Sequence, residues 1–142
     1  NGFTIGYEAA TLDDLIGRLK AAGVQVVIDV RAIAASRRAG FSKTVLAASL
    51  AAENIDYVHL RALGTPKAGR DAARKGRIAE MHEIFERQLA EPQAQIELLK
   101  AGEIAAGRKA ALLCFEANAC GCHRAVVARR LGEKAPFEVV DL

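Results

Sequence analysis

The sequence predicts a single α/β domain over residues 1–142, with a mostly parallel five-stranded sheet and helices on both faces in a Rossmann-like, three-layer arrangement. Strand-like apolar runs alternate with stretches of helical periodicity, as in parallel sheets joined by crossover helices. The run at residues 24–31 is nearly continuous and β-branched, which is typical of a strand buried on both faces. With 51% hydrophobic and 26% charged residues, the chain has the composition of a folded domain and not of a disordered or fibrous one.

Each expected element has its own local signal. Strands are expected at residues 3–7, 24–31, 55–60, 110–116 and 137–142. Helices are expected at residues 12–22, 42–53, 78–89, from 92 onward and 125–131. Thr11 can cap the first helix and Gly23 can end it. In the helix that begins at Pro92, the expected apolar face contains Ile96, Leu98 and Leu99.

Residues 61–76 are rich in Gly, Pro and Arg, and they predict a long loop with one helical turn near Ala72. Long loops in compact domains are often functional. No run of 18 apolar residues predicts a membrane span, and three cysteines without a secretion signal favour a reducing, cytoplasmic compartment.

Positive charge is concentrated in two segments, although the formal net charge is only +3. Residues 31–43 contain four basic residues and no acid, and residues 61–77 contain six basic residues and one acid. The remainder of the chain is net acidic. This distribution favours a local site for an anion, and the alternative is a pair of solvated basic loops.

Polar residues follow the predicted strands at the edge where parallel sheets bind ligands. Carboxylates, imidazoles, a thiol and guanidinium groups are expected to converge there on a phosphate, sulfate or carboxylate group. A helix N-terminus near residue 123 would add backbone N–H donors. The polar residues and thiols placed at this edge are Tyr7, Glu8, Asp29, Arg31, His59, Arg61, Cys114, Glu116, Cys122, His123 and Arg124.

Each of these residues also has a structural interpretation. Asp29 could pair only with Arg31, since buried polar groups find partners. His59 could be a half-buried strand histidine, and Glu116 could be the structural partner of Arg124. Tyr7 could serve only in packing.

Metal and thiol chemistry are weaker interpretations of the same region. The spacing of Cys114, Cys120, Cys122 and His123 lacks the paired pattern of a zinc site, and Mg²⁺ held by Asp29 and Glu116 is the alternative. No metal and no cofactor are predicted. Cys122 is a candidate nucleophile, because a helix start favours its thiolate.

Several stretches taken together resemble a known family. They are Thr4–Tyr7, Asp29–Arg31, Ser36–Arg37, Gly40–Lys43, Tyr57–Leu60, Leu63–Gly64, Leu113–Glu116 and Cys122–Arg124. This set resembles the bacterial and archaeal family called domain of unknown function 488, over nearly the whole chain. The resemblance implies a cytosolic α/β domain without an agreed activity.

Carried over residue by residue, the resemblance points to one set of positions. They are Asp29, Arg31, Ser36, Arg37, Phe41, Lys43, His59, Glu116, Cys122, His123 and Arg124. Family members often have a Pro ahead of the Ser-Arg pair, where this chain has Ala34 and Ala35.

Three functions fit this pattern. The first is an enzyme acting on a phosphate-bearing substrate, a nucleotide or nucleic acid. In that hypothesis Arg31, Arg37 and Arg124 hold the anion. Proton transfer falls to an acid or a histidine, with these candidates: Asp29, Glu116, His59 and His123. The second is a non-catalytic nucleic-acid-binding module, although only Phe41 offers an aromatic ring in the basic loops. The third is a small interaction domain with a structural ion network.

Overall fold

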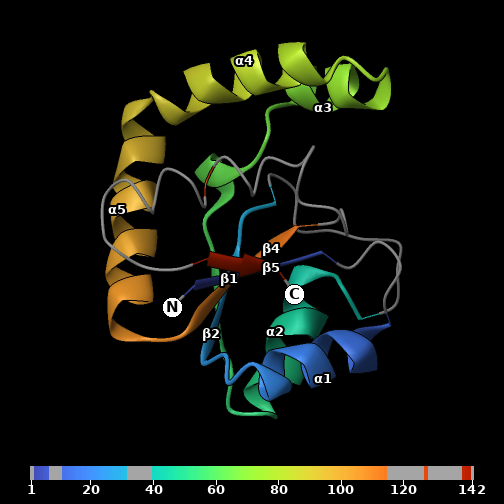
Figure 1. Cartoon of the computed structure of the whole chain (residues 1–142), viewed down its shortest axis with the longest axis vertical. Coiled ribbons are helices and arrows are strands. Elements are labelled where there is room, and N and C mark those ends of the chain that lie inside the picture. The colour runs from blue at the N-terminus through green and yellow to red at the C-terminus, as the bar shows by residue number, and fades with distance from the viewer. Residues whose placement is uncertain (1, 7–10, 32–39, 115–126, 128–138, 142) are drawn as a thin grey trace.

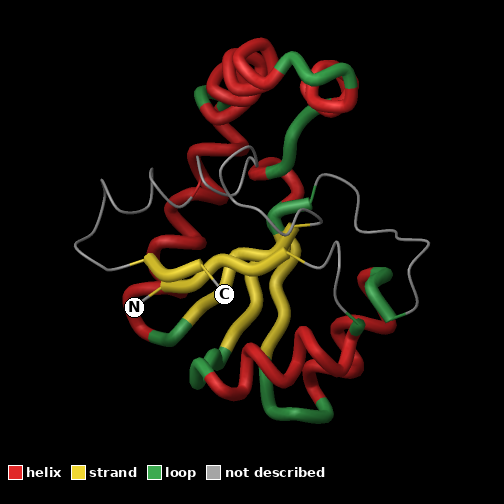
Figure 2. The backbone as a smooth tube through the Cα atoms, turned by 45° about the vertical axis from the view of Figure 1, so that its right-hand side comes forward, coloured by secondary structure: helices red, strands yellow, loops and turns green. Residues whose placement is uncertain are grey.

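The computed structural model describes residues 2–6, 11–31, 40–114, 127 and 139–141, which contain a five-stranded sheet with parallel pairing throughout. The strands are β1 (Gly2–Gly6), β2 (Val26–Asp29), β3 (Asp56–His59), β4 (Ala110–Cys114) and β5 (Val139–Asp141). Their order across the sheet is β3-β2-β4-β1-β5. Helices pack against both faces (Figure 1 and Figure 2). The predicted mixed α/β class with a parallel sheet is confirmed.

One face of the sheet is covered by α1 (Leu12–Ala21) and α2 (Lys43–Ala51). Thr11 caps α1 as expected, because its hydroxyl accepts a hydrogen bond from the Asp14 backbone N–H at 3.2 Å while the Asp14 carboxylate accepts one from the Thr11 N–H. Apolar side chains of both helices then pack on β2 and β4. The core on this side includes Leu15, Leu19, Val27, Leu46, Leu50 and Ala111.

The opposite face is covered chiefly by α5 (Pro92–Gly107), with α4 (Ile78–Leu89) above it. The buried positions of α5 are Ala94, Glu97, Leu98, Ala101 and Ala105. Their spacing of three and four residues forms one stripe, and its alanines allow the helix to approach the sheet closely. Ile96 and Leu99 lie off this stripe and are 49% and 57% exposed, so the expectation that they belong to the buried face was wrong.

The segment expected as a long loop is largely helical. It contains a 3-10 turn, η1 (Arg61–Leu63), and the eight-residue helix α3 (Lys67–Arg74). The expectation underestimated the helix because Gly69 and Pro66 were read as breakers, whereas Pro66 precedes the first turn and the remaining residues favour helix. Gly69 is required by packing, since a Cβ there would lie 2.5 Å from Cγ2 of Thr65.

The topology places η1, α3 and α4 beyond the carboxyl end of β3 (Figure 1). The helix expected at residues 125–131 lies outside the described residues except for Val127, which is buried in the core beside α5. Of the helices that the structure describes, none combines the length and apolarity needed to cross a lipid bilayer.

Candidate functional site

Asp29 is the last residue of β2 and is completely buried. Side chains alternate along a strand, so Asp29 shares the α1–α2 face with Val27. Its Oδ1 accepts hydrogen bonds from the Arg31 backbone N–H at 3.0 Å and from Nε of Arg31 at 2.8 Å. Its Oδ2 accepts from Nη2 of Arg31 at 2.6 Å and from the Tyr57 hydroxyl. These contacts occupy most of the lone pairs that a carboxylate offers.

Arg31 completes a closed ion pair. Its guanidinium meets Asp29 through two nitrogens, and Nη1 donates to the Phe41 carbonyl oxygen at 2.7 Å. Arg31 is 5% exposed. A buried pair of this kind is retained only when its hydrogen bonds are satisfied, because desolvation of both charges is costly. Asp29 thus forms the ion pair with Arg31 that one interpretation expected, and it also accepts a hydrogen bond from Tyr57.

Tyr57 is a member of this network that the sequence analysis missed. It pairs with Val27 in the β2–β3 register and so lies diagonally across from Asp29 on the same face. The pKa of Tyr57 is raised well above its ordinary value. The larger cause is burial of the hydroxyl, and the second is its hydrogen bond to Asp29. The available signal was the period of two in β3, which places Tyr57 and His59 on one face.

His59 lies opposite Asp29 in the register and is half-buried. Its Nε2 is 2.7 Å from the Arg31 carbonyl oxygen, so it contacts the backbone of the network. Phe41 is 1% exposed within the core, and its carbonyl oxygen accepts a hydrogen bond from Nη1 of Arg31. Lys43, the first residue of α2, is exposed.

The remaining predicted residues lie outside the part of the chain that the structure describes. They are Tyr7, Glu8, Ser36, Arg37, Glu116, Cys122, His123 and Arg124. Among the described residues, no group of three or more His, Cys, Asp or Glu side chains is arranged to hold a metal ion.

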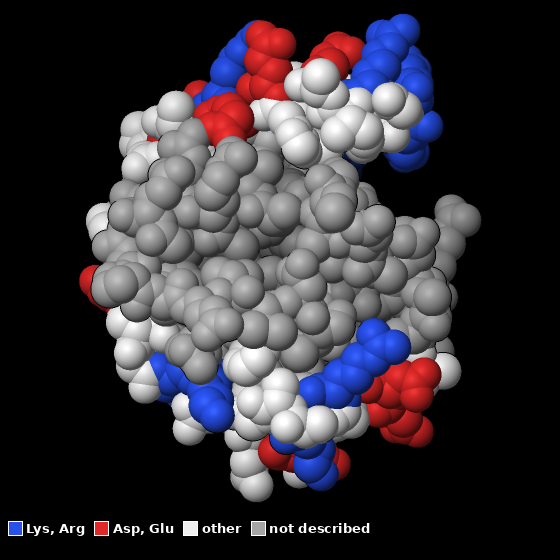
Figure 3. Space-filling view, viewed as in Figure 1, with Lys and Arg blue, Asp and Glu red and all other residues white. Residues whose placement is uncertain are grey.

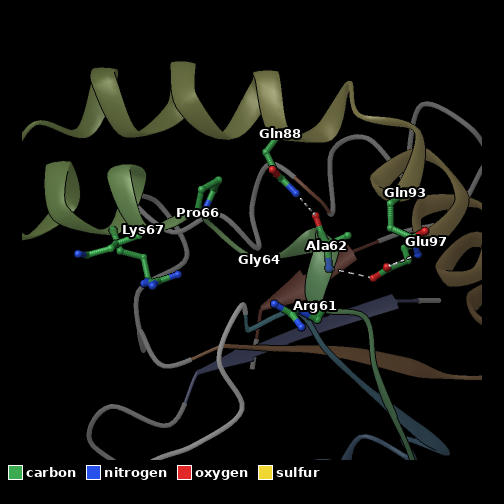
Figure 4. Close-up of a pocket in the computed structure, with 9 residues that line it drawn as sticks. Arg61, Ala62, Gly64, Pro66, Lys67, Gln88, Gln93 and Glu97 are labelled. Atoms are coloured by element: carbon green, nitrogen blue, oxygen red, sulfur yellow. Dashed lines mark hydrogen bonds between the residues drawn. The ribbon is translucent and has the colours of Figure 1, made fainter.

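A pocket of about 590 Å³ lies beyond the carboxyl end of β3, between η1, α3, α4 and α5 (Figure 4). This volume falls within the range of about 300–1,000 Å³ that is usual for small-ligand sites. Its lining residues are Arg61, Ala62, Gly64, Pro66, Lys67, Arg70, Gln88, Gln93 and Glu97.

The pocket has three cationic side chains in its lining. Arg61 and Lys67 are exposed, and Nη1 of Arg70 donates to the Thr65 carbonyl oxygen at 2.8 Å. Within the described part of the chain, none of the three forms an ion pair. Figure 3 shows Lys and Arg side chains gathered at one end of the α3–α4 pair.

Glu97 forms the opposite wall and is 6% exposed. Its Oε1 accepts from the Ala62 backbone N–H at 3.0 Å, and its Oε2 accepts from Nε2 of Gln93 at 2.8 Å. Gln88 donates to the Ala62 carbonyl oxygen at 3.3 Å. These bonds tie η1 to α4 and α5 and so hold the wall of the pocket in place.

The sequence analysis placed Arg61 at this edge and identified the basic character of residues 61–77, but it gave no role to the other pocket residues. Arg61 and Lys67 were detectable as members of a basic segment that follows a strand. The contribution of Gln88, Gln93 and Glu97 had no sequence signal, because they come from helices that only the tertiary structure brings to η1.

A model of the family described as Domain of unknown function DUF488 matches residues 11–131. The chain belongs to this family. The match confirms the resemblance found in the sequence. The matched residues of this DUF488 protein include both the Asp29 network and the pocket. No curated protein and no solved structure matches the chain.

Proposed function

We propose that this DUF488 protein binds a phosphate-bearing ligand at the carboxyl edge of its sheet, with Arg61, Lys67 and Arg70 as the cationic contacts. The observation that carries the proposal is the pocket, which all three side chains line and in which none of them forms an ion pair within the described part of the chain. Arginine suits such a role, because its planar guanidinium matches phosphate oxygens in two places at once.

Asp29 and Arg31 take a different part in this proposal from the one first expected. Asp29 and Arg31 form a buried ion pair with each other. We propose that they position the edge of the sheet and do not contact the ligand. The backbone N–H of Leu60 donates to the Asp29 carbonyl oxygen at 3.0 Å, directly before η1. The network thereby supports the segment from which Arg61 extends.

Catalysis remains an additional proposal. The candidates for proton transfer or nucleophilic attack near a bound phosphate are His59, Glu116, Cys122 and His123. Arg37 and Arg124 are further proposed anion contacts, with Ser36, Lys43 and Tyr7 beside them. We also propose a cytoplasmic location.

The finer fold description belongs with these proposals. Parallel strands with helices on both faces are Rossmann-like, but the order β3-β2-β4-β1-β5 differs from the order 3-2-1-4-5 of the dinucleotide-binding fold. The shared feature that matters for function is the ligand position beyond the carboxyl ends of the strands.

Titration calorimetry with inorganic phosphate and pyrophosphate tests the binding proposal. Replacing Arg61 or Lys67 by Ala removes a charge-assisted contact worth about 1.5–3 kcal/mol, so affinity should fall by about tenfold or more. Arg87→Ala is the matched control, because Arg87 pairs with Glu83 on α4 and does not line the pocket. Binding that is absent, or equal in all variants, would reject the proposal.

Nucleic acid is the second candidate ligand, because α3 carries Lys67, Arg70 and Arg74 and is followed by Lys75 and Arg77. If the protein neutralises about six phosphates of duplex DNA, the logarithm of its binding constant should fall linearly with the logarithm of the salt concentration. The slope should be about −0.9 per neutralised phosphate. A ligand with one phosphate group would show a slope several times smaller. Repeating the titrations at several salt concentrations therefore separates the two.

A further inference from the structure

The two sides of the pocket are lined by different kinds of side chain, and this difference indicates which groups a ligand would carry at each end. Figure 4 shows Lys67 on α3 at one side, and Gln93 with Glu97 on α5 at the other. Arg61 and Ala62 of η1 lie between them. The α3 side of the pocket therefore carries the cations Lys67 and Arg70, the α5 side carries a carboxylate and an amide, and Arg61 lies between the two.

The walls of the pocket formed by α4 and α5 are rich in hydrogen-bond acceptors. Gln88 and Gln93 each use their Nε2 atom as a donor to a protein oxygen, which leaves the Oε1 atom of each amide without a hydrogen bond in the described part of the chain. Acceptors of this kind recognise O–H and N–H groups. A ligand that fills the pocket would satisfy them with hydroxyl or amino groups.

Glu97 restricts the charge of the ligand. It is buried, and its carboxylate is held in place by the Ala62 N–H and by Gln93. A second phosphate at that end would meet a fixed negative group in a poorly solvated position, where like charges repel strongly. The pocket thus favours one anionic group at the α3 side and excludes another at the α5 side.

We infer that the pocket binds a small phosphate monoester whose organic part carries hydroxyl or amino groups. The phosphate lies against Arg61, Lys67 and Arg70, and the donors of the organic part lie against Gln88, Gln93 and Glu97. A sugar phosphate and a nucleoside monophosphate share this chemistry. The inference rests on the proposed function, because it assumes that the cations hold a phosphate group.

Calorimetric titration of the full chain with four probes tests this inference: methyl phosphate, ribose 5-phosphate, adenosine 5′-monophosphate and a short single-stranded oligonucleotide. At least one of the two organic monoesters should bind tenfold or more tightly than methyl phosphate. The tighter of the two identifies the organic part as sugar or nucleoside. Arg61→Ala should weaken all three monoesters, whereas Gln93→Leu should remove only the preference over methyl phosphate.

Gln95→Leu is the matched control, because Gln95 lies on the same helix but outside the pocket lining. Equal affinity for methyl phosphate and both organic monoesters would overturn the inference and leave the proposed function intact. Tighter binding of the oligonucleotide than of every monoester would overturn it in favour of nucleic acid. If no probe binds and inorganic phosphate does not bind either, the proposed function fails as well. Thermal unfolding of each variant shows that a loss of binding is not a loss of folding.

Discussion

The two charged regions at the carboxyl edge of the sheet differ in what their charges contact. Asp29 and Arg31 are 0% and 5% exposed and bond to each other, to Tyr57 and to the backbone. Arg61 and Lys67 are exposed at the pocket, and neither forms an ion pair among the described residues. The first region is a buried ion pair, and the second has exposed cations at a pocket.

This difference shows why a charged segment alone does not identify a binding site. A guanidinium removed from water must find an internal partner, and once paired it has little left to offer a ligand. A solvated cation keeps its donors available and loses only water when an anion arrives. Burial therefore separates the role of Arg31 from that of Arg61, although both follow a strand of the same sheet.

Asp29→Asn is expected to have the largest effect on stability. The substitution leaves the Arg31 charge buried without its counter-charge, so the free energy of unfolding should fall by about 3–5 kcal/mol. Urea unfolding measures the loss. Glu83→Gln breaks an exposed ion pair on α4 and should change stability by less than about 1 kcal/mol. Similar values for the two variants would mean that the Asp29 network is not a buried ion pair.

Gly69→Ala should have the next largest effect and connects stability with the pocket. The added Cβ would lie 2.5 Å from Cγ2 of Thr65, so the packing of α3 must change at a cost of about 1–3 kcal/mol. The Thr65 carbonyl also holds Arg70, and phosphate binding should weaken in the same variant.

Gly17→Ala is the matched control for this substitution, because a Cβ on Gly17 of α1 meets nothing within 4 Å. Gly17→Ala should leave stability equal or raise it by up to about 1 kcal/mol, since alanine favours helix. Urea unfolding measures the stability of both variants, and calorimetric titration measures their affinity for phosphate. A Gly69→Ala protein as stable as the parent would show that α3 is not packed as described.

Tyr57→Phe should give the smallest loss of stability near neutral pH, about 1.5 kcal/mol, because one hydrogen bond to the Asp29 carboxylate is removed while the Arg31 contacts stay. Its pH dependence is more informative. The pKa of Tyr57 is raised in the folded protein, so the unfolded chain loses this proton first as pH rises. The stability due to Tyr57 is complete below its unfolded pKa of about 10 and is lost as pH rises above that value.

Chemical unfolding between pH 8 and pH 11 measures this contribution. The parent protein should lose stability more steeply above pH 10 than Tyr57→Phe does. Tyr7→Phe is the control, since Tyr7 is the other tyrosine of the chain and should leave the slope unchanged if Tyr57 is its source. Equal slopes in the parent and in Tyr57→Phe would mean that Tyr57 ionises alike in the folded and unfolded states.

Local sequence signals predicted several elements of the fold correctly. The cap at Thr11, the β-branched run of β2 and the start of α5 at Pro92 all appear where expected. The errors fell where packing overrides propensity. Gly69 is a poor helix former in isolation, yet α3 continues through it, and a Cβ at this position would lie 2.5 Å from Cγ2 of Thr65. The buried face of α5 likewise follows the alanines and not the larger Ile96 and Leu99.

The sequence by itself determined the fold class, the strand ends at which polar residues gather and the membership of the DUF488 family. Hydrophobic periodicity and strand alternation are properties of neighbouring residues, so they can be read along the chain. Only the tertiary structure decided which charges became buried partners and which line a pocket. That outcome depends on solvent exposure and on contacts such as Tyr57 with Asp29, or Ala62 with Glu97, between residues far apart in the chain.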